Sequence, residues 1–172
     1  AKPDVKLASR VPLRVLVCDD NTINQKVAVR LLQQLGYRAD VAANGLEALA
    51  ALDRQPYDLV FMDLMMPEMG GLEATRLIRE RQKQPAQFPN YSIPIVVVAM
   101  TASAMEGDRE KCLAAGMEDY IAKPVRLDDV RSVVERWGPA ATRAEAAAAE
   151  TTGFQTAAAA EAASTATEDG PV

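Results

Sequence analysis

The sequence predicts an α/β protein in which one parallel β-sheet is covered by helices on both faces. Five short apolar runs alternate along the chain with five segments whose apolar residues recur at helical spacing. The runs are continuously apolar, as strands buried on both faces of a sheet are. The sequence shows no internal repeat. Strictly alternating strands and helices of this kind fold into a single layered sheet.

The strands are short and rich in β-branched residues. The fourth, IVVVAM, is the most apolar, and the second is the weakest. We expect the five strands at residues 14–18, 38–42, 58–62, 95–100 and 119–122.

The helices are predicted from apolar residues three or four positions apart. The first has Ile23, Val27, Leu31 and Leu35 at spacing four, and Gly36 stands where a helix-ending glycine is expected. The last has Val130, Val133, Val134 and Trp137 on one side. The segment at residues 82–92 contains two prolines and no helical or strand periodicity, so we expect a long loop between the third helix and the fourth strand. The five helices are expected at residues 23–35, 44–52, 72–81, 103–115 and 127–137.

Composition divides the 172 residues into three parts. Residues 1–13 have mixed character and are expected to be a linker, and residues 14–137 form the domain. Residues 138–172 are expected to be an Ala-rich flexible tail, because a stretch with few large apolar residues cannot bury enough surface to fix one structure.

Charge and composition exclude several classes of function. The net charge of −5 comes mostly from residues 139–172, which hold one arginine and five acidic residues. The near-neutral remainder has no basic excess of the kind that nucleic-acid binding needs. The chain has no histidine, its two cysteines lack metal-type spacing, and no long apolar run predicts membrane contact by this segment. We therefore expect this segment to lie in the cytoplasm, either as part of a cytoplasmic protein or as the cytosolic part of a membrane-bound sensor.

Polar side chains with matching chemistry stand where four of the predicted strands end. Asp19 and Asp20 follow the first strand, and Asp63 follows the third. Thr101 and Lys123 end the fourth and fifth. Ligands of an open parallel sheet bind beyond the carboxyl ends of its strands, so we expect these groups to lie together.

Three neighbouring carboxylates repel one another unless a cation joins them, and Mg²⁺ is the usual hard cation for oxygen ligands. A carboxylate can also accept a phosphoryl group as a nucleophile. The transfer needs positive charge and hydrogen-bond donors around the phosphoryl oxygens, which a metal, an ammonium and a hydroxyl supply. The residues thus predict a phosphoryl-transfer site with its nucleophile on the protein.

Four stretches resemble the receiver domains of two-component signalling. They are VLVCDDNTINQ (15–25), DLVFMDLMMPEMGG (58–71), VVVAMTA (96–102) and DYIAKPV (119–125), and the likeness covers residues 14–137. The resemblance implies a flavodoxin-like, doubly wound sheet with strand order 2-1-3-4-5. It also implies that the domain catalyses its own phosphorylation and dephosphorylation.

The resemblance implies a role for each matching residue. Asp63 corresponds to the phosphorylated aspartate. Asp20 corresponds to the direct Mg²⁺ ligand and Asp19 to the acid that acts through water, while the backbone carbonyl of Met65 is the third protein ligand. The remaining residues are Thr101, which closes on the phosphoryl group, Lys123, which bridges to it, Tyr120, which swings inward as a switch, and Pro124, which follows a cis peptide bond.

Two stretches, DDNTINQ and MTASAMEGDREKCLAAGMEDYIAKPV, are similar to receivers fused to hybrid histidine kinases. The implied phosphoryl donor is a phosphohistidine on a histidine kinase dimerisation domain or a histidine phosphotransfer domain. Its expected docking surface is the start of the first helix, with the loops after Thr101 and Lys123. From that helix Asn21, Thr22, Asn24 and Gln25 are expected to contribute, with apolar surface from Val27, Ala28 and Leu31. A stand-alone response regulator is the alternative setting.

Other functions fit the residues less well. An Asp-nucleophile phosphohydrolase needs a second acid two positions after Asp63, where Met65 stands. In a flavodoxin-like cofactor binder, Asp19 and Asp20 would repel the phosphate of the cofactor. A receiver-like scaffold that takes no phosphoryl group remains an alternative. The methionines Met62, Met65, Met66 and Met69 are expected to serve packing, since thioethers bind soft metals.

Overall fold

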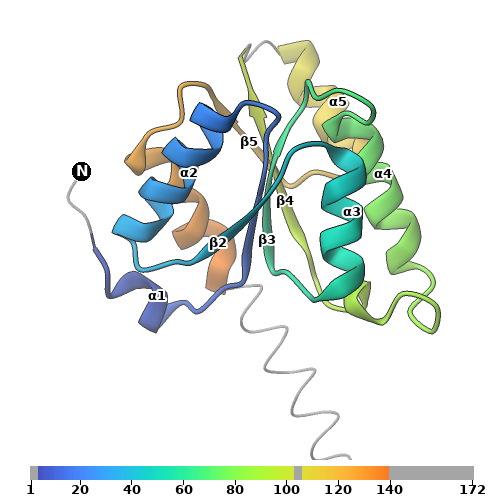
Figure 1. The fold of residues 1–172 in the computed structure, drawn as a ribbon, viewed down its shortest axis with the longest axis horizontal. Coiled ribbons are helices and arrows are strands. Elements are labelled where there is room, and N and C mark those ends of the chain that lie inside the picture. Colours follow the sequence, from blue (N-terminus) through green and yellow to red (C-terminus); the bar gives the residue numbers. More distant parts are fainter. Residues whose placement is uncertain (1–3, 103–105, 140–172) are drawn as a thin grey trace, which may run out of the picture.

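The computed structural model describes residues 4–102 and 106–139, and its five strands form one parallel sheet (Figure 1). The strand order is β2-β1-β3-β4-β5, which confirms the order implied by the resemblance. Every strand begins and ends within one residue of its predicted position. The strands are β1 (Val15–Cys18), β2 (Ala39–Ala42), β3 (Leu59–Asp63), β4 (Val96–Thr101) and β5 (Asp119–Ala122).

Helices cover both faces of the sheet, as Figure 1 shows. On one face lie α2 (Thr22–Gln34) and a final helix at residues 127–139, and on the other lie α3 (Gly45–Arg54), α4 (Gly71–Gln82) and α5 (Glu106–Ala115). The five predicted helices are confirmed. The start predicted for the fourth, at residues 103–105, lies outside the described residues, as does the predicted tail beyond residue 139.

The strands bury side chains in two separate hydrophobic clusters, one on each face. Leu16 and Cys18 of β1 belong to the cluster under α3, α4 and α5, whereas Val15 and Val17 belong to the cluster under α2 and the final helix. This alternation explains why the central strands β1, β3 and β4 are buried along their whole length, whereas the edge strands β2 and β5 are partly exposed. Among the described helices, none combines the length and the apolar character that crossing a membrane requires.

The apolar residues at spacing four that predicted the first helix are in part exposed on α2. Ile23 and Val27 are 71% and 43% exposed. The buried residues of the helix are Ala28 and Leu32, followed by Leu35 just after its end. The packing side is therefore rotated from the predicted one, because the small Ala28 lets α2 approach the sheet where a larger side chain would hold it away. The prediction that Ala28 contributes apolar docking surface is wrong, because Ala28 is buried, whereas Val27 is exposed as such a surface requires.

Residues 4–13, where the sequence predicts a linker, pack against the domain. They contain the short helix α1 (Leu7–Arg10), and Leu7 is buried. The backbone N–H of Ala8 donates to the carbonyl of Leu35 at 3.1 Å. Near the end of the described residues, a Cβ atom at Gly138 would lie 2.5 Å from a methyl group of Val11, so the first and last described segments touch.

The segment at residues 82–92, predicted as a loop, also has structure of its own. It contains the 3-10 helix η1 (Pro89–Tyr91), whose Tyr91 is 1% exposed. The Tyr91 hydroxyl donates to the Leu49 carbonyl at 3.1 Å and contacts Asp53 at 2.9 Å. Aromatic residues here extend the core beneath α3 and α4.

Candidate metal and phosphoryl-transfer site

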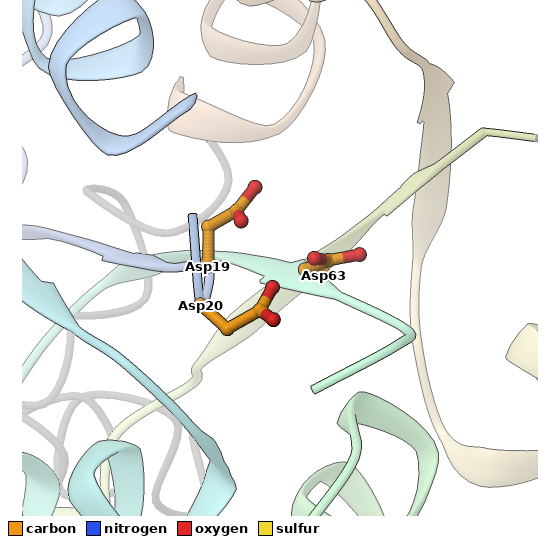
Figure 2. Close-up of side chains that lie close together, drawn as sticks. All are labelled: Asp19, Asp20 and Asp63. Carbon is orange, nitrogen blue, oxygen red and sulfur yellow. The ribbon is translucent and has the colours of Figure 1, made fainter. Parts of the chain in front are cut away.

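Three carboxylates meet at the carboxyl ends of two neighbouring strands. Asp19 and Asp20 follow β1, and Asp63 ends β3 (Figure 2). Because Cys18 of β1 pairs in register with Met62 of β3, the acids follow side by side. One oxygen from each of the three carboxylates lies within 4.8 Å of the others. The sequence-predicted acids are therefore brought together.

Local hydrogen bonds fix the orientation of these acids. Asp19 is 1% exposed, and its Oδ1 accepts from the backbone N–H of Asn21 at 2.9 Å. The Asn21 side chain in turn accepts from the Ile23 N–H at 2.8 Å and caps α2. The Asp63 Oδ1 accepts from the Met65 N–H at 3.3 Å, while Asp20 is exposed. The site thus has a buried wall and one acid facing solvent.

Lys123 joins two of the acids from the end of β5. Its Nζ lies 2.9 Å from Asp19 Oδ2 and 3.0 Å from Asp63 Oδ2. The contact with Asp19 is an ion pair without hydrogen-bond geometry, so this buried oxygen has no hydrogen-bond partner among the described residues. The predicted cis peptide bond between Lys123 and Pro124 is present.

The charges of the site are incompletely balanced. Burial raises the pKa of Asp63, the charge of Asp19 raises it further, and Lys123 opposes both. Burial would lower the pKa of Lys123, but its contacts with the two carboxylates leave that pKa raised. One ammonium thus stands among three carboxylates, which favours an additional cation.

The donor set fits a hard divalent cation such as Mg²⁺. Three carboxylate oxygens lie at suitable separation, and the single ammonium of Lys123 is shared between Asp19 and Asp63. The Met65 side chain is 82% exposed, so the prediction that it serves packing is wrong, whereas Met62 is fully buried. The exposed side chain does not affect the expectation for the Met65 backbone carbonyl, because a carbonyl oxygen can bind a hard cation independently of its side chain. Met65 stands two residues after Asp63.

The remaining predicted residues lie on the two strands beside the acids. Thr101 ends β4, is 7% exposed, and its carbonyl accepts from the Lys123 N–H at 2.8 Å. Tyr120 lies in β5 and packs against the cluster on the α3–α4–α5 side. The Arg109 guanidinium stands over its ring, with 5.8 Å between guanidinium carbon and ring centroid.

Sequence reasoning assigned Gln25 only to the docking surface, but it also supports the site. Its side-chain N–H donates to the backbone carbonyl of Asp19 at 2.6 Å. The signal was present in the sequence: Gln25 stands one turn into the helix that follows Asp20, where a long amide can reach back to the strand end. This bond helps to hold the turn that carries both acids.

Comparison with known proteins gives a consistent family. Residues 15–135 match the family model for the response regulator receiver domain. Hybrid signal transduction histidine kinase G of Dictyostelium discoideum is 41% identical over 138 residues, which cover 79% of this chain and 4% of that protein. Sensor histidine kinase GacS of Pseudomonas protegens is 36% identical over 143 residues, 83% of this chain and 15% of that protein. The chain therefore spans a small part of these relatives.

Two solved structures are similar in fold and sequence. The receiver domain of sensor histidine kinase PA1611 from Pseudomonas aeruginosa, with a magnesium ion coordinated in its active site cleft, has a TM-score of 0.62 and 38% identity, over 73% of this chain and 96% of that one. The co-crystal structure of the Saccharomyces cerevisiae phosphotransfer protein Ypd1 with the receiver domain of Ssk1 contains a chain with a TM-score of 0.67 and 33% identity, over 80% and 91% of the two chains.

Proposed function

Because this chain belongs to the response regulator receiver family, we propose that it takes a phosphoryl group from a phosphohistidine onto Asp63 and changes conformation in response. The observation that carries the proposal is the meeting of three carboxylates with the Lys123 ammonium at one end of the sheet. Such a site attracts a cation and presents a nucleophilic carboxylate in one place.

In the proposed step an oxygen of Asp63 attacks phosphorus and forms a new P–O bond. The P–N bond to the donor imidazole breaks, its electron pair stays on the ring nitrogen, and the ring takes up a proton. Lys123, 3.0 Å from Asp63 Oδ2, is placed to contact the transferred phosphoryl oxygens, and the Thr101 hydroxyl would close on them. A bound Mg²⁺ would neutralise charge on those oxygens.

The proposed cation ligands are Asp20, Asp63 and the Met65 carbonyl, with Asp19 acting through water. Exposure favours this division, because Asp20 faces solvent while Asp19 is buried against Lys123. We predict that Asp20→Ala weakens Mg²⁺ binding more than Asp19→Ala does, as measured by calorimetry. Equal losses in the two variants would contradict the division of roles.

The donor must lie on a separate domain, because these 172 residues contain no histidine. We propose that it is a histidine-bearing helical bundle, either a kinase dimerisation domain or a phosphotransfer domain, of a hybrid-kinase relay in the cytoplasm. The exposed apolar residues Ile23 and Val27 at the start of α2 suit such a partner, since they lie just after the acids of β1. The similarity to a receiver crystallised with Ypd1 supports this choice.

The central experiment is the intact mass of the protein after incubation with a small acyl phosphate. We expect one added phosphoryl group when Mg²⁺ is present and none when it is chelated. Asp63→Asn keeps the shape of the side chain and removes the nucleophile, so it should stay unlabelled. Asp53→Asn, the same change at the end of α3, is the matched control and should be labelled normally. Full labelling of Asp63→Asn would refute the assignment.

Docking can be tested separately from chemistry. Val27→Lys should slow transfer from a phosphohistidine bundle about tenfold while leaving acyl-phosphate labelling intact. Leu113→Lys on α5 makes the same change at a side chain of similar exposure, 51%, and should transfer normally. Changes at Ala28 are unsuitable because it is 4% exposed, and Gln25 is unsuitable because it holds the Asp19 carbonyl. Equal transfer rates in the two lysine variants would place the partner elsewhere.

A further inference from the structure

The loop between β3 and α4, at residues 64–70, carries the Met65 carbonyl and is held at both of its ends. At the near end the Leu64 N–H donates to the Met100 carbonyl at 3.3 Å, and the Gly71 N–H donates to the Leu64 carbonyl at 3.1 Å. Between the ends, the Met65 N–H reaches Asp63 Oδ1 at 3.3 Å. The far end of the loop, at Met69, is placed by a separate contact.

That far end rests against the first residue of α3. The Gly45 N–H donates to the Met69 carbonyl at 2.9 Å. A Cβ atom at Gly45 would lie 2.6 Å from Met69 Cγ and 2.8 Å from the Met69 carbonyl oxygen. The second of these atoms belongs to the backbone, so turning the Met69 side chain cannot make room. Gly45 does not have a left-handed backbone, and close approach of the loop is what requires glycine there.

The start of α3 is itself firmly placed, so the loop would have to move. The Asn44 side chain, 9% exposed, accepts from the Glu47 N–H at 2.9 Å and caps the helix. Glu47 reaches back to accept from the Ala43 N–H at 3.2 Å. Ala48, Leu49 and Leu52 bury the next turns of the helix in the core. An added methyl group at position 45 thus pushes on the less anchored partner, the loop.

We propose that Gly45 is a positioning residue for the cation site, acting through Met69 on the loop that presents the Met65 carbonyl. The inference rests on the proposed function, in which that carbonyl is a ligand. Gly45→Ala should displace the far end of the loop and move the carbonyl from its binding position. Residues that orient metal ligands typically change affinity by about 10- to 100-fold, and we expect about a tenfold weaker affinity for Mg²⁺.

The experiment measures Mg²⁺ dissociation constants by calorimetry on the full chain. Gly107→Ala is the matched control, since a Cβ atom there, in the first turn of α5, would meet nothing within 4 Å. We expect Gly45→Ala to bind Mg²⁺ about tenfold more weakly and Gly107→Ala to bind normally. Acyl-phosphate labelling of Gly45→Ala should be slow at limiting Mg²⁺ and recover at saturating Mg²⁺, which a general loss of structure would not produce.

Met69→Ala provides a second variant should Gly45→Ala fail to fold. It removes the side chain that rests on α3 from a partly exposed loop position, and it should also weaken Mg²⁺ binding. If Gly45→Ala folds and binds Mg²⁺ normally, the positioning role is overturned and the proposed function is not. If Gly45→Ala does not fold, normal Mg²⁺ affinity in Met69→Ala has the same meaning. An unaltered chain that binds no Mg²⁺ overturns the proposed function and this inference with it.

Discussion

The two ends of the β-sheet use charged residues in opposite ways. At the amino end two acids each have their own arginine: Arg14 pairs with the buried Asp58 and Arg79 with the half-buried Glu118, at 2.9 and 2.7 Å. At the carboxyl end Asp19 and Asp63 share the single ammonium of Lys123. The acids at the amino end are therefore neutralised within the fold, whereas those at the carboxyl end outnumber their cation.

The Arg79 cluster shows what complete pairing looks like. Its guanidinium donates to both oxygens of Glu118 and to the carbonyls of Gly116 and Ile95. Glu118 also accepts from the Val97 N–H at 2.7 Å. The cluster ties α4 to the amino ends of β4 and β5. By contrast, Asp19 keeps a buried oxygen without a hydrogen bond at the other end of the sheet.

Breaking the paired end should have the largest effect. Arg79→Met keeps much of the apolar stem but leaves Glu118 and two carbonyls without their donor, so we expect a loss of about 3 kcal/mol in the free energy of unfolding. Urea unfolding measures it. Arg76→Met, on the exposed side of the same helix, should change stability by less than about 0.5 kcal/mol. Similar losses in both variants would show that the contacts of Arg79 with Glu118 and the two carbonyls do not stabilise the fold more than an exposed arginine does.

Removing one carboxylate from the carboxyl end of the sheet should instead raise the free energy of unfolding. Without Mg²⁺, Asp63→Asn removes one buried charge from beside Asp19 and should stabilise the protein by about 1 kcal/mol. Mg²⁺ at about ten times its dissociation constant should stabilise the unaltered chain by about 1.4 kcal/mol and leave the variant unchanged. Thermal unfolding with and without Mg²⁺ tests both statements. A destabilised Asp63→Asn protein would mean that the carboxyl end is as well paired as the amino end.

The smallest effect concerns pH at the paired end. Burial raises the pKa of Glu118 more than Arg79 and the Val97 N–H lower it. As pH rises, the Glu118 carboxyl group therefore loses its proton in the unfolded chain before it does so in the folded chain. The free energy of unfolding should fall as pH rises from the ordinary glutamate pKa through the raised one. Glu118→Gln should flatten the part of the pH profile that lies just above the ordinary glutamate pKa. Glu110→Gln, on the exposed side of α5, should leave the profile unchanged.

The sheet and the cluster of acids were predictable because strands impose simple rules. Continuous apolar runs such as Val96–Met100 reveal buried strands, and parallel strands place their carboxyl ends at one edge. The strand pattern alone therefore predicts that Asp19, Asp63 and Lys123 meet. Distances within the cluster depend on side-chain orientation, which the pattern does not contain.

Helix faces and connecting segments were harder to predict. The spacing of Ile23, Val27 and Leu31 indicates an apolar side but not whether the sheet or a partner covers it, and Ala28 decides the packing side by being small. Tyr91 is buried although two prolines made its segment resemble a loop. The contact of Gly45 with Met69 joins two helix starts far apart in sequence, and no local signal reports it.

The contact between Gly138 and Val11 brings the two connections of the domain together. Both lie at the amino end of the sheet, beyond the strand starts at Val15 and Leu59, and the acids lie at the opposite end. A domain whose connections share one corner can be inserted into a longer chain, or circularly permuted by joining them, without rerouting any strand. A longer chain joined at that corner would leave the opposite edge of the sheet, with Asp19, Asp20 and Asp63, clear of both connections.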